Sequence, residues 1–164
     1  PGALDSVPAG IAIFNSNVVA VGGNRTNTST PPWKCAAVAL KLSSGNLDTA
    51  FGTVTLTGGT NNKGISIFSH DGADPTKDCI VNSVSASPMG SYLLLTGTAY
   101  SGTNYDYLSA ELDTTGTLVS TYGSSGIKVQ ASGPADDILI SGTAFGWCAW
   151  QSLWSREELK LLAL

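Results

Sequence analysis

Few side chains in this sequence have the types and spacing that catalysis requires. The single histidine, His70, lies in a polar stretch that is typical of an exposed turn. Two acidic pairs have residue types that can act in glycoside hydrolysis, Asp106 with Glu111 and Asp136 with Asp137, although both pairs also suit turn and rim positions. The sequence contains no nucleophile-elbow, phosphate-loop or zinc-protease motif. We therefore expect no enzymatic activity and no catalytic residues.

A second kind of chemistry to consider is metal binding. Asp71, Asp74 and Asp78 could bring carboxylate oxygens to one calcium ion within a single loop. Their spacing departs from the calcium-loop pattern, and aspartate beside glycine or proline is common in turns. We expect no metal and no cofactor.

The three cysteines fit no zinc or redox motif, because no two are separated by only two residues. Cys35 and Cys79 each flank an insertion between expected strands, so we predict a disulfide between them. Cys148 is left over, either as a buried thiol or as a bridge to another molecule.

Composition narrows the class of protein. The chain has 164 residues, 42% of them hydrophobic and 12% charged, with a net charge of −4. Eight scattered basic residues argue against nucleic acid, which needs clustered Lys and Arg. No apolar run reaches the ~18 residues that a membrane span requires.

The chain starts at Pro1 without a leader, which a removed signal peptide would explain. The sequons at Asn24 and Asn27 predict glycosylation, with an ordinary polar turn as the alternative. We expect an extracellular or cell-surface location.

The sequence repeats a glycine-punctuated strand pattern. Val18–Gly23 is echoed by Leu93–Thr98 and more faintly by Ile138–Thr143. Ala39–Gly52 is echoed by Ala110–Gly123, with equivalent glycines 71 residues apart. A long period built from short strands is typical of stacked or radially arrayed β-units.

Alternating apolar residues and turn residues predict about four antiparallel strands in each unit. We expect one β-repeat domain over residues 1–145, with units at about 1–58, 59–131 and a partial unit at 132–145. In the first unit, strands are expected at 10–14 and 18–21 (a hairpin), at 36–42 and at 53–57. In the second unit they are expected at 81–86, 92–96, 105–112 and 126–131.

The last residues, 146–164, depart from this pattern and are predicted to form a docking tail. Ser155 and Glu158 make a helix capping box, and Leu159 and Leu162 form an apolar stripe, so we predict a short C-terminal helix. Three tryptophans occur within eight residues. Such a cluster either anchors a protein interface or closes the core of the last unit. The residues predicted to form an interface are Trp147, Trp150, Trp154, Leu159 and Leu162.

The repeat residues resemble the delta-60 repeat, a β-propeller-type unit of large surface and secreted proteins. The resemblance rests on Val19–Gly23, on Ala39–Gly52 followed by Val54-Thr55, and on Leu95–Gly97 and Ala110–Gly123 followed by Ile127–Val129. It covers roughly residues 1–145, and insertions at 24–33 and 68–78 depart from it. The resemblance implies an all-β, propeller-like or sandwich fold with a scaffold role and no catalytic residues.

The expected function follows from the number of units. Propellers close with about four to eight blades, and this chain supplies two and a fraction. Open sheet edges and apolar faces then need a partner. We expect a non-enzymatic structural subunit that associates with itself into a filament or appendage. The alternative is a carbohydrate- or protein-binding module of a larger secreted propeller protein, using Trp33 or the sequon loop on glycans.

Overall fold

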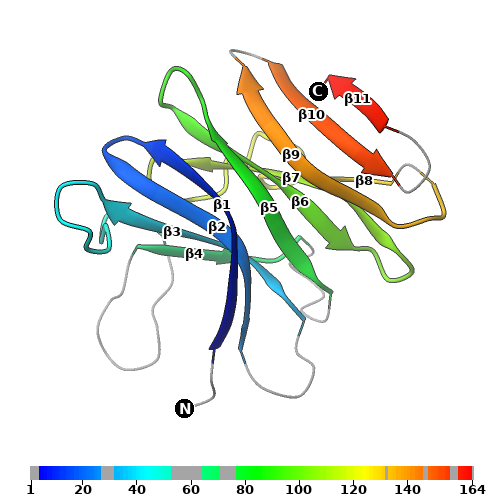
Figure 1. Ribbon diagram of the computed structural model, residues 1–164, viewed down its shortest axis with the longest axis horizontal. Coiled ribbons are helices and arrows are strands. Elements are labelled where there is room, and N and C mark those ends of the chain that lie inside the picture. The colour runs from blue at the N-terminus through cyan, green and yellow to red at the C-terminus, as the bar shows by residue number, and fades with distance from the viewer. Residues whose placement is uncertain are drawn as a thin grey trace.

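The computed structural model is built from antiparallel β-sheets (Figure 1) and describes residues 4–26, 32–52, 64–70, 77–131, 133–145, 148–155 and 159–163. The described residues form eleven strands in three sheets and include no helix. Accordingly, no described segment is a helix long and apolar enough to cross a membrane. The all-β prediction is confirmed.

The first two sheets share one design, in which four strands follow each other in chain order. Sheet A contains β1 (Leu4–Phe14), β2 (Asn17–Thr26), β3 (Lys34–Lys41) and β4 (Ile65–Phe68). Sheet B contains β5 (Cys79–Ala86), β6 (Tyr92–Tyr100), β7 (Tyr105–Asp113) and β8 (Ile127–Gln130). Sheet C contains β9 (Asp137–Phe145), β10 (Cys148–Ser155) and β11 (Leu159–Ala163).

The predicted hairpin near the N-terminus is confirmed. β1 and β2 pair up to Phe14 and Asn17, which leaves Asn15 and Ser16 as the two turn residues. Both have positive φ, 47° and 65°, as a two-residue turn of the twist-matching type requires. Asparagine tolerates this conformation better than most residues.

The three sheets follow one another in space, with sheet B between sheets A and C (Figure 1). β5 packs against β1, β2 and β3, and β9 packs in the same way against β5, β6 and β7. β6 is therefore covered on both faces, and successive residues Leu93, Leu94 and Leu95 are at most 1% exposed. This explains why residues 93–95 of β6 are continuously apolar instead of alternating.

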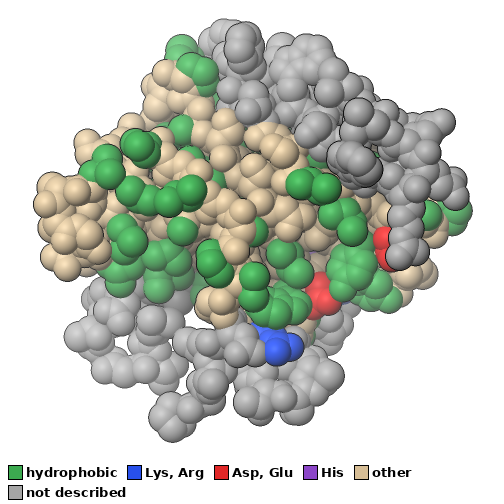
Figure 2. Space-filling model, in the orientation of Figure 1, with side chains coloured by type: hydrophobic (Ala, Val, Ile, Leu, Met, Phe, Trp, Pro, Cys, Tyr) green, Lys and Arg blue, Asp and Glu red, His purple; other side chains and the backbone are tan. Residues whose placement is uncertain are grey.

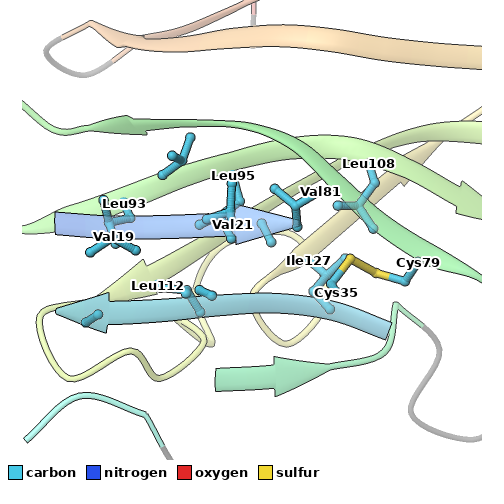
Figure 3. Packing of buried hydrophobic residues seen from close by; sticks show 14 of the residues in the cluster. Val19, Val21, Cys35, Cys79, Val81, Leu93, Leu95, Leu108, Leu112 and Ile127 are labelled. Atoms are coloured by element: carbon cyan, nitrogen blue, oxygen red, sulfur yellow. A yellow bond between two sulfur atoms is a disulfide. The ribbon is translucent and has the colours of Figure 1, made fainter. Parts of the chain in front are cut away.

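The main core lies between sheets A and B. Figure 3 shows Val19 and Val21 of β2 beside Leu93 and Leu95 of β6, with the disulfide at one side. Burial of such side chains contributes about 1.5–3 kcal/mol each. The predicted Cys35–Cys79 disulfide is present, and both cysteines are fully buried. It joins the start of β3 to the start of β5 and so fastens sheet A to sheet B.

The predicted C-terminal helix is wrong. Leu159–Ala163 forms strand β11, which pairs with β10 from Trp154↔Leu159 to Trp150↔Ala163. A helix of about ten residues is marginal by itself, whereas a strand beside β10 finds partners for its backbone groups at once. Sheet C contains residues on both sides of the predicted boundary at 145, and the division into repeat domain and tail stays a prediction.

The fourth strand of sheet A lies later in the chain than the sequence pattern indicated. The strand expected at 53–57 falls outside the described residues, and the observed fourth strand is β4. Gly64-Ile65 enters β4 as Gly126-Ile127 enters β8, in each case after a glycine with positive φ. The connection that leads into β8 is much shorter than the one that leads into β4. The repeat of the fourth strand is therefore clearer in the structure than in the sequence.

Loss of the disulfide should lower stability substantially. The bridge closes a loop with a sequence separation of 44 residues, which the chain-entropy relation values at about 4 kcal/mol. We expect the Cys35→Ala/Cys79→Ala variant to lose about 2–4 kcal/mol in denaturant unfolding followed by tryptophan fluorescence. As a control, a reducing agent should lower the midpoint of the wild type and leave that of the variant unchanged. Equal midpoints for oxidised wild type and variant would contradict the prediction.

Candidate assembly surface

The side of sheet A that faces away from sheet B is apolar over three neighbouring rows of residues. Residues that pair across an antiparallel sheet share a face, and three neighbouring rows cross this sheet. We call their residues the free face; it comprises Ile11, Ala20, Val38 and Ile65 in one row, Ile13, Val18 and Leu40 in the next, and Pro8, Gly22, Ala36 and Ile67 in the third. The alternate residues, such as Val19 and Ala37, are buried against sheet B.

Large side chains of the free face remain in contact with solvent. Ile11 is 69% exposed and Ile13 is 68% exposed. Beside them a groove of about 420 Å³ is lined by residues that include Val7, Val38 and Ile67. None of the described residues that line it is charged. In Figure 2 apolar side chains lie over the left part of the view, where sheet A is found, and charged ones are few.

Comparison with sheet B shows whether the equivalent face is buried there. In both sheets the first strand has a bulge, at Pro8/Gly10 in β1 and at Val81/Ser83 in β5. A glycine of the second strand pairs with the residue before each bulge, Gly22 with Pro8 and Gly97 with Val81. A Cβ atom at Gly22 would collide with the carbonyl oxygen of Val7, and one at Gly97 with that of Ile80. The two glycines therefore mark equivalent positions.

This equivalence identifies the counterpart of each free-face row. The row through Ala20 corresponds to the row through Leu95, whose members are at most 8% exposed: Val84, Leu95, Ala110 and Ile127. That row belongs to the core between sheets A and B. Sheet A therefore covers the face of sheet B that contains Leu95. The equivalent face of sheet A itself, which contains Ala20, is the free face.

A third bulge, between Leu139 and Ser141, shows how sheet C fits this scheme. It lies in β9, opposite Leu153 and Ser152 of β10. The faint sequence echo places Ile138–Thr143 with the second strands, but the bulge and the packing on sheet B make β9 equivalent to the first strands β1 and β5. The mistake arises because short apolar stretches before glycine look alike in sequence, whereas bulge position is a three-dimensional property.

The predicted interface residues fall into different parts of sheet C. Trp150 and Trp154 lie in β10, where Trp154 pairs with Ile138 of β9 and with Leu159 of β11. Leu162 pairs with Gln151 and so belongs to the opposite face. Trp147 lies outside the described residues. Their role in an interface stays a prediction.

The predicted glycosylation sites are described in part. Asn24 lies near the end of β2, where its side-chain amide donates a hydrogen bond to Ser6 Oγ at 2.9 Å. Asn27 lies outside the described residues. Cys148 belongs to β10, and its predicted state as free thiol or intermolecular bridge stays open.

Of the aspartates considered for metal binding, Asp71 and Asp74 lie outside the described residues, whereas Asp78 fixes segments of the fold, as does Asp136 from one of the acidic pairs. Asp78 accepts hydrogen bonds from the backbone nitrogen of Trp33 at 2.7 Å and from the hydroxyl of Tyr105 at 3.0 Å. It thereby joins three segments beside the disulfide. Asp136 accepts a bond from the backbone nitrogen of Tyr105 at 3.0 Å. Among the described residues, no group of three potential ligands could hold a metal ion.

The pair Asp106 and Glu111 is not brought together. The two residues are five positions apart in β7, about 17 Å along a strand, and they point to opposite faces. Asp106 is buried and accepts a bond from Asn104 at 2.8 Å. Glu111 pairs with Leu94 on the side toward sheet C, and burial raises the pKa of its carboxyl group above the ordinary value of 4.5.

Comparison with known proteins gives no family assignment: no model of a protein family matches the chain, and no curated protein matches its sequence.

Replacement of Gly22 should destabilise sheet A, because an alanine methyl group would meet the Val7 carbonyl. We expect Gly22→Ala to lose about 1–3 kcal/mol in denaturant unfolding, the usual cost of overpacking. Gly133→Ala is the matched control, since no atom lies within 4 Å of a Cβ built there. If the two variants were equally stable, the glycine-and-bulge contact would not be the constraint inferred here.

The raised pKa of Glu111 gives a pH dependence of defined sign. A carboxyl group that binds its proton more tightly in the folded state makes folding less favourable as the pH rises through and above 4.5. Glu111→Gln should therefore be more stable than the wild type at pH 7, and the difference should vanish near pH 3.5. Unfolding midpoints of both proteins across this range measure the effect. A difference that is independent of pH would contradict the stated cause.

Proposed function

We propose that this chain is a non-enzymatic structural protein of the extracellular space or cell surface, a β-repeat subunit that associates with itself to build a filament or appendage. We further propose that its sheets are propeller-like units similar to the delta-60 repeat. The observation that carries the proposal is the free face of sheet A, an apolar surface whose counterpart in sheet B is buried.

The energetics favour a covered state for this surface. Each fully buried valine, leucine or isoleucine contributes about 1.5–3 kcal/mol relative to the exposed side chain. Contiguous apolar patches of several hundred Å² on soluble proteins mark interaction sites. Ile11 and Ile13 are more than two-thirds exposed, and they adjoin an apolar groove, so a partner gains free energy by covering them.

A loop next to the free face supports the same conclusion. In sheet B, the backbone at Gly116 packs against the ring of Phe51, and its carbonyl accepts a bond from Ser66 Oγ at 2.5 Å. The equivalent glycine of sheet A is Gly45, which has a similar φ of 70° and no atom within 4 Å of its Cβ position. The docked loop in sheet B thus has an undocked counterpart in sheet A.

The non-enzymatic and extracellular parts rest on separate observations. The carboxylates Asp78, Asp106 and Asp136 are engaged in hydrogen bonds that fix segments of the fold. The buried Cys35–Cys79 disulfide is compatible with an oxidising, extracellular location. Trp33, the residue considered for glycan binding, is partly buried and lies under Arg25, whose guanidinium carbon is 4.9 Å from the ring centroid. These contacts favour a structural role for this ring.

Charge on the free face should abolish self-association. We expect wild-type protein to form oligomers or polymers in light scattering across a dilution series, and Ile11→Lys/Ile13→Lys to be monomeric. Loss of two buried isoleucines corresponds to at least a hundredfold weaker association. Both side chains are exposed in the single chain, so the variant should keep the unfolding midpoint of the monomer.

Met89→Lys is the matched control, because Met89 is 66% exposed in the turn between β5 and β6 of sheet B and is not a residue of the free face. This variant should associate like the wild type. A wild-type protein that stays monomeric at all concentrations would contradict self-association and would favour the binding-module alternative, to be followed by glycan retention assays.

A further inference from the structure

We infer that the surface that covers the free face of sheet A is the far face of sheet C of a second copy, so that copies join head to tail. This inference rests on the proposed self-association and names the partner surface. It uses the register of sheet C together with the way in which sheets A, B and C follow one another within the chain.

The first step is to identify the two faces of sheet C. Leu139 is fully buried and packs with Tyr107 of sheet B, and Gly142 lies against Thr96. Ile138, which precedes Leu139, is 47% exposed. The face that carries Ile138 is therefore the one directed away from sheet B, and we call it the far face.

The second step is to place residues on the far face by backbone pairing. Three rows cross the sheet on the side of Ile138, on either side of the bulge. These rows are Ile138, Trp154 and Leu159; Ser141, Ser152 and Leu161; and Thr143, Trp150 and Ala163. The far face thus collects two of the predicted interface tryptophans together with Leu159. It includes no charged residue among those placed by register.

The third step compares these rows with sheet A. Counted from the bulge, Trp150 and Ser152 of β10 occupy the positions of Val19 and Val21 of β2. Leu161 and Ala163 occupy those of Ala37 and Ala39. The residues in these positions of sheet A form the surface that covers sheet B. The far face of sheet C is therefore equivalent to the surface with which sheet A covers its neighbour.

The free face of sheet A and the far face of sheet C are consequently complementary. The free face of sheet A is equivalent to the face of sheet B that sheet A covers. The far face of sheet C is equivalent to the face with which sheet A covers sheet B. The same step, from one sheet to the next, occurs twice within the chain, from A to B and from B to C. A third repetition places β1 of one copy against β9, β10 and β11 of the next. A contact of this kind between different surfaces gives a closed ring or an open filament.

A mixing experiment tests head-to-tail joining. The first variant, Ile11→Lys/Ile13→Lys, disables the free face, and the second, Ser152→Lys, disables the far face. Ser152 is suited to this because its replacement removes no large apolar side chain. We expect each variant alone to be monomeric in light scattering, at least a hundredfold weaker in association than the wild type. An equimolar mixture should form a one-to-one heterodimer, since each variant retains one intact surface.

Other outcomes overturn the inference in distinguishable ways. If Ser152→Lys alone associates like the wild type, the free face pairs with another surface, and self-association stands while the head-to-tail inference fails. If both variants are monomeric and the mixture stays monomeric, the inference also fails. If the wild type is monomeric, the proposed function and the inference fail together.

A second variant guards against misfolding of Ser152→Lys. Ala163→Lys lies on the same face, in the edge strand β11, where a lysine disturbs the sheet least. It should reproduce the loss of association and the rescue by mixing. Met89→Lys serves again as the control that associates normally. Circular dichroism and an intact disulfide confirm that each variant is folded before its mass is measured.

Discussion

The packing of an apolar sheet against a neighbour on each side is the constraint on which this structure depends. Sheet B satisfies it, since β6 is buried on both faces and contributes Leu93 and Leu95 to one neighbour and Leu94 to the other. The core between sheets A and B is the larger one, and the Cys35–Cys79 disulfide reinforces it. Within the part of the chain that the structure describes, sheet A repeats the design of sheet B with one neighbouring sheet in place of two. The exposure of apolar side chains on its free face follows from that single difference.

The same constraint explains the glycines that recur at equivalent positions of the repeated sequence. At Gly22 and Gly97 the backbone of the bulged strand comes so close that no side chain fits. A bulge of this kind bends the first strand and increases its local twist. In sheet C the bulge persists, and Leu153 stands opposite its first residue, where the other sheets have glycine. Sheet C therefore retains the strand geometry without the sequence signal that marks it elsewhere.

Much of the local structure could be predicted from the sequence, and less of its long-range arrangement. Alternation and turn residues located the hairpin at Asn15-Ser16 and the strands of sheet B, and the positions of Cys35 and Cys79 beside insertions located the disulfide. β4 was not predicted, because eleven residues separate Gly52 from Gly64 where sheet B needs only two. The C-terminal residues have a helical pattern of leucines, but pairing with β10 decides their conformation. The free face could not be found from alternation alone, because both faces of sheet A are apolar.

The two interfaces within the chain differ in character, and the difference bears on assembly. The core between sheets A and B is a large apolar cluster, whereas sheet B presents Thr96, Ser109 and the carboxyl group of Glu111 toward sheet C. An apolar interface gains more free energy per unit area, and a polar one depends more on matched hydrogen bonds. The free face is of the apolar kind, whereas the rows placed on the far face of sheet C combine tryptophan and leucine with Ser141, Ser152 and Thr143. A contact between them would therefore combine the characters of the two interfaces that the chain already forms, because apolar side chains gain free energy by burial while the hydroxyl groups of the far face need matched hydrogen bonds.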